Sequence, residues 1–586
     1  IEKPDAKVID LAVGSGTLLV AAYRRKRELL QKSKGTIELE DHKRFLEQDL
    51  TGVDIMPFAA HLAVMHLSLQ ALLSETEKVR IAVWDSTELK PGMNIPAISS
   101  ELKAAYRRPT LDMFKEGAIT SREAYVKKGA ITLEGVGGEE IPLEKADLVI
   151  MNPPFTRQER LPKDYKNALK KRLKEYDDYL HGQLGLYGYF IFLGDRFTKE
   201  RGRMALVLPA SVLRVQSALG IRRLLTENYH IEYIMTTWQR AAFSEGARFR
   251  EILVVAKRLS DEMKVHDYSC GIVKLKMLPT GLEQSREIAN KIKSIVRSSS
   301  PGTLHKEENM AIKVISMREL KKNHRNIFRY ISSQEEGLEE TWNTITTKAG
   351  TEVAPFKDVL REVNGRILEG ARARSHMIQA PIGSLFILRD VERANKREDL
   401  WVLKKESKRV LTAENVITHS KINIPRKSFH FGLRRLSGTN TIDLSEKLDF
   451  VLVDSFKGWE DYFINENTNC MAQQMPRWRR YVEDRLSKLA VAFRFNISAK
   501  GTSLFAWYSS KPMAGCGVVW NIEGLSEDHA KILSIWFNST VYALQIYLDR
   551  VETEGAWMQL HKYVMDDLLV IHPSRLSKSQ KEAVLR

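Results

Sequence analysis

The sequence predicts an α/β protein in which a mostly parallel, doubly wound sheet is followed by a mixed α+β domain. Short apolar runs alternate with longer amphipathic stretches through the first 260 residues, and this alternation is typical of βαβ units. A glycine-containing turn joins the first apolar run to a helical stretch. After about residue 346 the chain changes to shorter β-like runs, loops and aromatic–basic clusters, so we expect the domain boundary between residues 345 and 346.

The first domain is expected to contain its strands and helices in a regular order. Strands are predicted at residues 8–11, 50–55, 79–84, 146–151, 204–208 and 251–257, and helices at residues 17–30, 59–73 and 284–296. Two insertions interrupt this order, a polar one over residues 86–146 and a strongly basic, helical one over residues 157–179. Residues 131–141 of the first insertion resemble a hairpin around a glycine cluster. Insertions at the carboxyl ends of parallel strands lie where ligands bind.

Composition narrows the class of protein. The 586 residues exceed one compact core and predict roughly two to four domains. A formal charge of +17 favours a polyanionic partner, with ordinary solvated surface charge as the alternative. The three cysteines are far apart and show no CxxC pair, so neither a zinc site nor a disulfide framework is expected. With no signal peptide and no apolar run of roughly 20 residues, we expect a cytoplasmic protein with no membrane contact.

Residues 10–16, which read DLAVGSG, form the first candidate site. A strand that ends in a glycine turn lets a ligand approach the backbone, and the following helix offers free N–H groups. A tight turn without a ligand is the alternative. Asp54 ends the second strand, where it could accept hydrogen bonds from ribose hydroxyls, and Asp85 follows the third, where it could accept from an adenine amino group. Each acid could instead serve as a helix cap or turn residue.

Asn152-Pro153-Pro154-Phe155 is the more specific motif. Two prolines remove backbone donors and fix φ, which holds the neighbouring carbonyls in a rigid, outward orientation. The Asn152 side-chain oxygen and the Pro153 carbonyl could accept both protons of a planar amine, while Phe155 stacks on its ring. Attack by such an amine on a sulfonium methyl group needs alignment of the two groups rather than a strong base. Their proximity would therefore supply much of the rate acceleration. The alternative is a stiff turn that only ends a strand.

Together these motifs resemble the S-adenosylmethionine-dependent amino-methyltransferases of DNA, in the arrangement where the cofactor motif precedes the catalytic one. The family's first motif reads Asp-Pro-x-Cys-Gly-Ser-Gly, and here Leu11 and Val13 replace the proline and cysteine. The resemblance implies a Rossmann-like class I methyltransferase domain over residues 1–345, with S-adenosyl-L-methionine as cofactor and adenine N6 as target. It implies cofactor contacts from Asp10, Ala12, Gly14, Ser15, Gly16, Asp54, Ile55, Asp85, Ser86 and Asn152, and catalytic roles for Asn152, Pro153, Pro154 and Phe155.

Two further segments extend the resemblance. Residues 186–190 and 202–209 are similar to the family's next helix and strand. Residues 242–244 with 248–255 are similar to the segment that supplies a base-packing aromatic side chain, for which we prefer Phe243 over Phe249. His61 and His66, in the apolar helix, are expected to be core or surface residues.

The family normally carries another cofactor-binding segment before the glycine motif, and only nine residues precede Asp10 here. Since the chain begins with Ile1 and enters a strand almost at once, we expect its natural N-terminus to be missing, or a separate polypeptide to complete the cofactor pocket. A nuclease constellation of Pro-Asp followed by Glu-x-Lys is not recognisable, because Pro4-Asp5 lacks a suitable partner. Nuclease activity could come from a missing N-terminal region or from a partner.

A base inside a duplex cannot reach such a site, so the target adenine would be flipped out and a second surface would hold double-stranded DNA. Residues 346–586 are predicted to be this target-recognition domain, as in type IIG-like restriction-modification enzymes. Interleaved basic and aromatic residues can combine phosphate contact, base readout and stacking, although each cluster could be a solvated face. The predicted DNA-binding residues are Arg372, Arg374, Arg434, Arg435, Arg477, Trp478, Arg479 and Arg480.

The resulting prediction is a site-specific DNA adenine-N6 methyltransferase of a restriction-modification or phage-defence system. Methylation of guanine N2 in RNA or of a glutamine amide in protein is the nearest rival, because those enzymes also use Asn-Pro-Pro turns. A non-catalytic DNA-binding subunit with a decayed cofactor pocket is the rival from another class.

Overall fold

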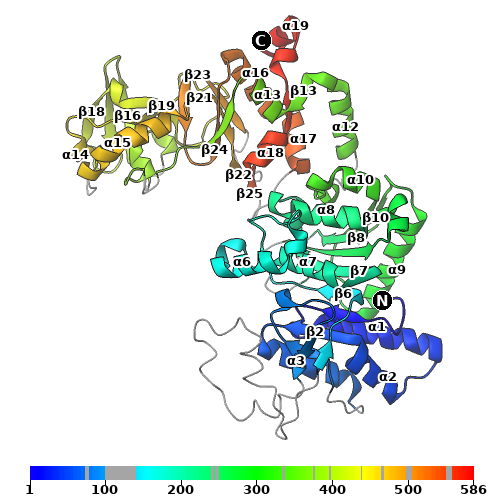
Figure 1. Cartoon of the computed structure of the whole chain (residues 1–586). Coiled ribbons are helices and arrows are strands. Elements are labelled where there is room, and N and C mark those ends of the chain that lie inside the picture. Colours follow the sequence, from blue (N-terminus) through cyan, green and yellow to red (C-terminus); the bar gives the residue numbers. More distant parts are fainter. Residues whose placement is uncertain are drawn as a thin grey trace. The chain divides into compact units, whose positions relative to one another are not determined.

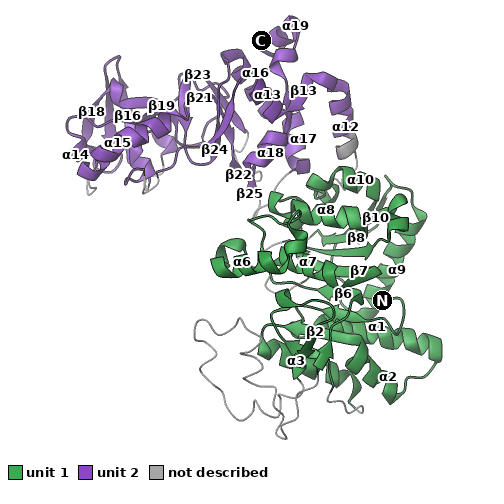
Figure 2. Ribbon diagram, viewed as in Figure 1, with its two compact units in different colours: residues 1–334 green, residues 335–586 purple. Residues whose placement is uncertain are grey.

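The chain consists of two compact units, Ile1–Gln334 and Glu335–Arg586 (Figure 2). The computed structural model describes residues 1–72, 78–98, 140–238, 243, 250–332, 337–373, 377–394, 398–436, 438–463, 468–496, 504–549 and 557–585. The boundary predicted between residues 345 and 346 falls inside α12 (Leu338–Ala349). This helix belongs wholly to the second unit, where it contacts α17 (Thr540–Asp549). No helix among the residues described has both the length and the apolar character needed to cross a membrane.

Unit 1 is built on a ten-stranded sheet with the order β11-β12-β10-β8-β9-β7-β6-β1-β2-β3. Its strands are β1 (Val8–Asp10), β2 (Leu50–Asp54), β3 (Ile81–Val83), β6 (Ala146–Met151), β7 (Thr198–Pro209), β8 (Tyr229–Thr237), β9 (Glu251–Arg258), β10 (Ser269–Leu275), β11 (Leu304–Lys306) and β12 (Met310–Ser316). From β3 to β7 all neighbours are parallel, and β9 runs antiparallel between β7 and β8. This mostly parallel α/β sheet confirms the fold class predicted for the first domain.

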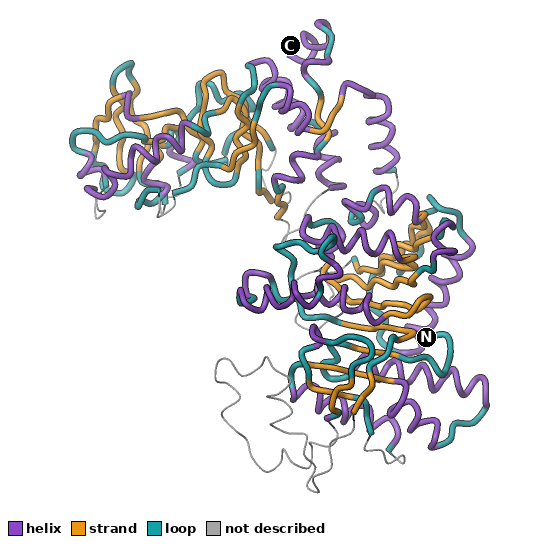
Figure 3. Tube along the Cα trace, in the orientation of Figure 1, coloured by secondary structure: helices purple, strands orange, loops and turns teal. Residues whose placement is uncertain are grey.

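Both faces of this sheet are covered, and Figure 3 shows helices flanking its strands. Successive residues of a strand point to opposite faces. Val8 and Leu148 accordingly belong to one hydrophobic core, and Ile9 and Val149 to the other. Such double burial explains why the strands appear in the sequence as continuous apolar runs. The covering helices include α1 (Thr17–Lys34), α3 (Pro57–Ser68), α7 (Leu186–Phe197), α8 (Leu219–Asn228) and α9 (Leu282–Ser298).

Four strands of the ten-stranded sheet were not expected from the sequence: β8, β10, β11 and β12. Polar residues interrupt the apolar pattern of β8, where His230 and Glu232 lie between buried positions. β10 is parallel to β8 and antiparallel to β12, so these strands extend the sheet beyond β8. The amphipathic helix α9, predicted at residues 284–296, packs on β10 and β12.

The two insertions leave the carboxyl side of the sheet. At the ends of the first, β4 (Asn94–Pro96) pairs antiparallel with β5 (Glu140–Pro142). The hairpin predicted at residues 131–141 lies outside the described residues, except for its last two. The second insertion forms α6 (Lys163–Arg172), which confirms its helical pattern. Figure 1 shows α6, in cyan, at the side of unit 1.

Unit 2 combines mixed sheets with helices, as predicted. Its largest sheet has seven strands in the order β14 (Arg366–Glu369), β24 (Val519–Glu523), β21 (Ser487–Ala492), β23 (Ala506–Gly515), β19 (Phe429–Leu433), β20 (Asp449–Leu452) and β15 (Phe386–Ile387). All pairs are antiparallel except β19 with β23. A separate meander contains β16 (Trp401–Glu406), β17 (Val410–Asn415) and β18 (Lys421–Pro425). The main helices are α13 (Phe356–Glu362), α15 (Thr468–Glu483), α16 (Glu527–Phe537), α17, α18 (Lys562–Asp567) and α19 (Lys578–Leu585).

Candidate active site

The carboxyl ends of four neighbouring strands meet at one edge of the sheet in unit 1. β1 pairs in parallel with β2 on one side and with β6 on the other, and β2 pairs with β3. The chain therefore extends the sheet in one direction through β3 and then returns to the far side of β1, which creates a topological switch point. Open α/β sheets bind ligands at such a point, outside the carboxyl ends of the strands. Asp10 ends β1 and Asn152 follows β6, so the two predicted motifs lie at this point.

The glycine turn after β1 is held by Asp54. The Gly14 amide donates a hydrogen bond to Asp54 Oδ2 at 2.9 Å. Both glycines have positive φ, +52° at Gly14 and +82° at Gly16, which other residues rarely adopt. A Cβ on Gly16 would lie 2.9 Å from the Ala63 Cα atom of α3, whereas among the described atoms a Cβ on Gly14 would meet nothing within 4 Å. Gly16 is therefore required for helix packing, while the space beside Gly14 is open to a ligand.

Asp10 is buried beneath this turn with one oxygen unused. Its exposed fraction is 1%, and its Oδ1 accepts a hydrogen bond from the Ala12 amide at 3.0 Å. Its Oδ2 is buried and has no hydrogen-bond partner in the described part of the chain. Burial, with a smaller contribution from the nearby Asp54 carboxylate, raises the pKa of Asp10 to about 7. A buried carboxylate without a full set of donors is expected to receive one from a ligand.

The remaining predicted cofactor residues surround the same edge. The Ser15 carbonyl lies 2.8 Å from Nδ1 of His66, so α3 also braces the glycine turn. Asp54 uses its second oxygen to accept from the Met56 amide at 2.8 Å. Ile55 is 46% exposed, and Ser86 is buried. Sequence reasoning predicted only a core or surface role for His66, because its contact with Ser15 spans 51 residues and follows no local pattern.

Asp85 is engaged by groups of its own chain. Its Oδ1 accepts from the Thr87 amide at 3.1 Å and from the Tyr165 hydroxyl at 3.3 Å. Its Oδ2 forms an ion pair with Arg172 Nη1 at 2.8 Å, and Arg172 also pairs with Glu88. An adenine bound by Asp85 as predicted would therefore share its carboxylate with Tyr165 and Arg172 of α6. Sequence reasoning missed Arg172, because nothing local connects two charges 87 residues apart.

The turn after β6 is anchored on both sides of its exposed asparagine. Asn152 is exposed, Pro153 is buried, and Phe155 is half-buried against the core of unit 1. The Thr156 carbonyl accepts a hydrogen bond from the Leu186 amide at 2.9 Å, which ties the turn to the first residue of α7. The structure thus supports a rigid turn that presents one polar side chain. Pro154 is half-buried within it.

Phe243, predicted to pack against a base, is half-buried. Its alternative Phe249 lies outside the described residues, as do the residues on either side of Phe243. The choice between the two therefore stays a prediction.

Two of the predicted DNA-binding residues have structural roles instead. Trp478 is completely buried, and its indole N–H donates to the Leu452 carbonyl at 2.8 Å, so it cannot stack on a nucleic-acid base as predicted. Arg434 is 9% exposed, and its Nε donates to Asp399 Oδ1 at 2.9 Å, which places its charge in an internal ion pair. Arg435 also pairs with Asp399, at 2.7 Å. The sequence shows that Arg434 and Arg435 are basic, but not that both pair with Asp399, which lies 35 and 36 residues away in the chain.

The other predicted DNA contacts are more accessible. Arg477 and Arg480 lie exposed on α15, and Arg479 is 42% exposed and paired with Glu483 at 2.9 Å. Arg372 donates from Nη2 to the Gly517 carbonyl at 3.3 Å. Arg374 lies outside the described residues.

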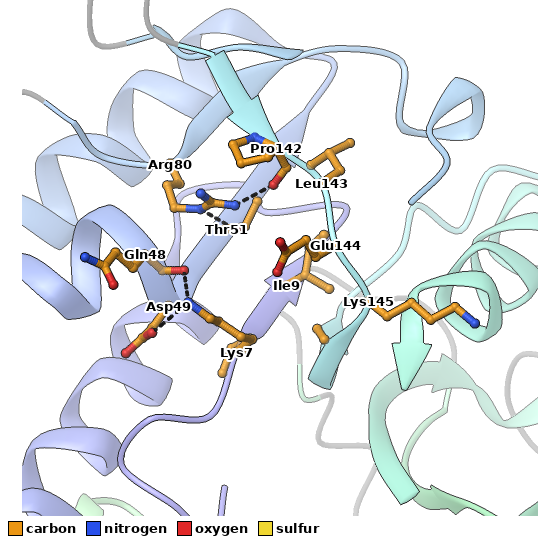
Figure 4. A pocket seen from close by; sticks show the side chains of 12 residues that line it. Lys7, Ile9, Gln48, Asp49, Thr51, Arg80, Pro142, Leu143, Glu144 and Lys145 are labelled. Carbon is orange, nitrogen blue, oxygen red and sulfur yellow. Dashed lines mark hydrogen bonds and ion pairs between the residues drawn. The ribbon is translucent and has the colours of Figure 1, made fainter. Parts of the chain in front are cut away.

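A cavity of about 170 Å³ opens at the opposite, amino-terminal edge of the strands (Figure 4). Arg80 braces it by donating to Thr51 Oγ1 at 2.9 Å and to the Pro142 carbonyl at 2.7 Å. On the other side Lys7 pairs with Asp49 at 3.2 Å. These residues lie at the start of β1, β2 and β6, so the cavity lies away from the predicted site.

Comparison with known proteins agrees with the motifs at the carboxyl edge. Residues 48–243 match the sequence profile of the Eco57I restriction-modification methylase family. The similarity to this family therefore lies within unit 1. The match covers β2, β3, β6 and the Asn152 turn, but begins after the glycine turn.

Individual relatives match over limited lengths. The type II restriction enzyme and methyltransferase RM.Eco57I of Escherichia coli is 21% identical over 289 residues, which are 46% of this chain and 26% of that protein. The type II methyltransferase M.BanIII of Aneurinibacillus aneurinilyticus is 30% identical over 118 residues, which are 20% of this chain and 19% of that protein. The matched part therefore spans about a quarter or less of these relatives.

The solved structures that match this chain include two restriction-enzyme proteins. The type IIG restriction endonuclease BpuSI is 14% identical, with 99% of this chain and 57% of that chain covered and a TM-score of 0.41. The M protein of the type I restriction enzyme EcoKI is 12% identical, with 54% and 60% covered and a TM-score of 0.33. At these scores the fold assignment of unit 1 rests on its own strand order.

S-adenosyl-L-methionine is the cofactor expected of this family, and the residues of the carboxyl edge fit it. The open space beside Gly14 admits a ligand close to the backbone. Asp10 Oδ2, which has no partner among the residues described, could accept a hydrogen bond from the ammonium of the methionine part. Asp54 ends β2 at the same edge, where the sequence predicts a contact with the ribose hydroxyls.

Proposed function

We propose that this chain is the methyltransferase and DNA-recognition part of a restriction-modification enzyme that methylates adenine N6 in double-stranded DNA. The observation that carries the proposal is the position of the Asn152 turn. It lies beside the glycine turn at the switch point of a mostly parallel sheet, in a segment that matches a restriction-modification methylase family. A cofactor held by the glycine turn would be adjacent to an amine held by Asn152.

The cofactor supplies a methyl group on a positively charged sulfur. In the proposed mechanism the chain's residues align the acceptor amine with it. The Asn152 side-chain oxygen and the Pro153 carbonyl accept the two amino hydrogens, so that the nitrogen lone pair leaves conjugation with the ring. Because Pro153 is buried and the next residues are tied to α7, the turn needs little rearrangement to hold this geometry.

Phe155 is proposed to stack on the flipped base, and Phe243 to pack on its other side. The half-buried state of both rings leaves each a surface for such a contact. Flipping costs a few kcal/mol, which stacking and the two hydrogen bonds offset.

Unit 2 is proposed to be the target-recognition domain that holds the duplex. Its accessible basic residues on α15, Arg477 and Arg480, are the candidates for phosphate contact. Since the chain spans only part of its relatives' length, we propose that a further polypeptide segment or a separate partner completes the cofactor pocket or adds nuclease activity.

Methyl transfer from labelled S-adenosylmethionine to unmodified genomic DNA, RNA and a protein extract tests the proposal. We expect label in DNA, recovered as N6-methyladenine after nuclease digestion. Label only in RNA or protein would identify the guanine-N2 or glutamine rival. Calorimetric titration with the cofactor addresses the remaining rival: no heat, with or without a candidate partner, would indicate a DNA-binding subunit without catalysis.

A further inference from the structure

Helix α6, which follows the Asn152 turn, has two chemically different faces. With 3.6 residues per turn, Tyr165, Leu169 and Arg172 share one side of the helix. Leu169 is completely buried, and the other two are partly buried against the end of β3. The opposite side carries the lysine face, defined as Lys163, Lys166, Lys170 and Lys171, at spacings of three, seven and eight residues.

The inward side fixes the helix to the predicted site. Arg172 pairs with Asp85 at 2.8 Å and donates to Thr87 Oγ1 at 2.7 Å. The Tyr165 hydroxyl donates to Asp85 Oδ1 at 3.3 Å. The side chains of Arg172 and Asp85 are 19% and 14% exposed. Because both are mostly buried, salt and solvent weaken their ion pair less than they would on the surface. The lysine face is therefore held in a defined position relative to the carboxyl edge.

Three of the four outward lysines make no polar contact within the described structure. Lys163, Lys170 and Lys171 are exposed, and among the described residues no hydrogen bond or ion pair engages them. Lys166 donates to Gln158 Oε1 at 2.9 Å. Asp164 is the one acidic residue of α6, in its first turn. Like charges three and four residues apart destabilise a helix slightly, so the lysine face has an energetic cost that no ion pair among the described residues offsets.

The size and place of the lysine face match a DNA backbone. From Lys163 to Lys171 the helix rises ~12 Å, and a DNA strand presents successive phosphates about every 3.4 Å along its axis. The face can therefore span roughly three phosphates. α6 starts eight residues after Phe155, so a duplex docked on this face would lie close to the turn that receives the flipped base.

We propose that the lysine face of α6 binds the phosphate backbone of duplex DNA next to the target base. This inference rests on the proposed function and adds to it a DNA contact in unit 1, separate from the recognition surface of unit 2. The Arg172–Asp85 pair positions the surface, and the lysines provide sequence-independent affinity.

The test compares two triple variants of the full chain. K163Q/K170Q/K171Q removes the exposed lysines of the face, and the matched control K293Q/K321Q/K322Q removes exposed lysines of α9 and α10 (Met317–Lys322), elsewhere in unit 1. Binding of a short fluorescein-labelled duplex is measured over a series of NaCl concentrations. We expect the face variant to lose about two to three units of slope in the plot of log affinity against log salt, and ~10-fold or more in affinity at low salt. The control should lose less than about one unit.

Equal slopes for the wild type and the face variant, with circular dichroism showing both folded, would overturn the inference. So would tighter, lysine-dependent binding to single-stranded RNA than to the duplex. Methylation of genomic DNA by the same preparations tests the proposed function independently of the lysine face. Methylation with unchanged slopes would refute only the DNA contact of the lysine face. A change of slope without methylation of any substrate would refute only the proposed methyltransferase activity.

Discussion

Helices α6 and α15 are both basic in sequence, but the structure gives their charges different roles. The lysines of α6 are exposed and are unpaired within the described chain, apart from Lys166. In α15 the neighbouring Trp478 is buried, and Arg479 pairs with both Glu483 and Asp454. Burial and pairing, rather than the number of basic residues, therefore indicate which helix can bind a polyanion.

The largest expected effect separates chemistry from binding. Asn152→Ala removes the side-chain acceptor for the target amine, so methylation should fall by ~100-fold or more. Duplex affinity should stay within a factor of about two, because the basic helices are untouched. Initial methylation rates and fluorescence anisotropy on one preparation provide the two measurements. A parallel loss of affinity would mean that the Asn152 turn contributes to DNA binding, which would break the assignment of that role to α6 and α15.

A second prediction concerns Asp10. Unlike the lysines of α6 and the arginines of α15, this carboxyl group is buried. Its pKa is raised from 3.8 to about 7, so the folded state binds a proton that the unfolded state has already released between these values. The free energy of unfolding should therefore fall as pH rises from about 4 to 7, with a slope of up to ~1.4 kcal/mol per pH unit from this group, and then level off.

Asp10→Asn should flatten this pH dependence, because the amide does not titrate. Urea denaturation of both proteins at several pH values measures it. The same slope in the two proteins would show that other groups cause the pH dependence.

A third prediction compares one arginine from each helix. Arg172→Ala leaves Asp85 and Glu88, both mostly buried, without their cation and should lower the free energy of unfolding by ~2 kcal/mol. Arg479→Ala removes a largely exposed pair and should cost less than about 1 kcal/mol. Urea denaturation gives both values. Similar costs for the two would show that the Arg172 cluster does not fix α6 more firmly than a surface ion pair would.

The smallest expected effect tests the DNA contact of α15. Neutralising Arg477, Arg479 and Arg480 should lower the salt slope by about one unit per lost phosphate contact. Because Arg479 is already paired with carboxylates, the total should be nearer two units than three. The salt titration used for α6 measures it, and an unchanged slope would remove this cluster from the interface and leave the lysine face as the main phosphate contact.

Local patterns predicted much of the first unit. Five of its six predicted strands overlap the structure closely, and the sixth, β7, begins earlier because Thr198 already pairs with Ala146. The positions of Asp10, Asp54 and Asn152 at strand ends also follow from the sequence, since each stands where an apolar run stops. The strands on the far side of β9 in the sheet could not be predicted from the sequence. Polar residues in β8 and β10 interrupt the alternating pattern of a strand, and only the neighbouring strands and α9 bury these segments.

Local sequence accounts for the order of the motifs, the glycine turn and the stiff Asn152 turn, because each depends on backbone geometry within a few residues. Long-range packing instead determines that Arg172 holds Asp85, that one oxygen of Asp10 has no hydrogen-bond partner among the described residues, and that Trp478 lies in a core while the lysines of α6 face solvent. These outcomes depend on groups tens of residues apart in the chain, and on burial, which a local pattern does not specify.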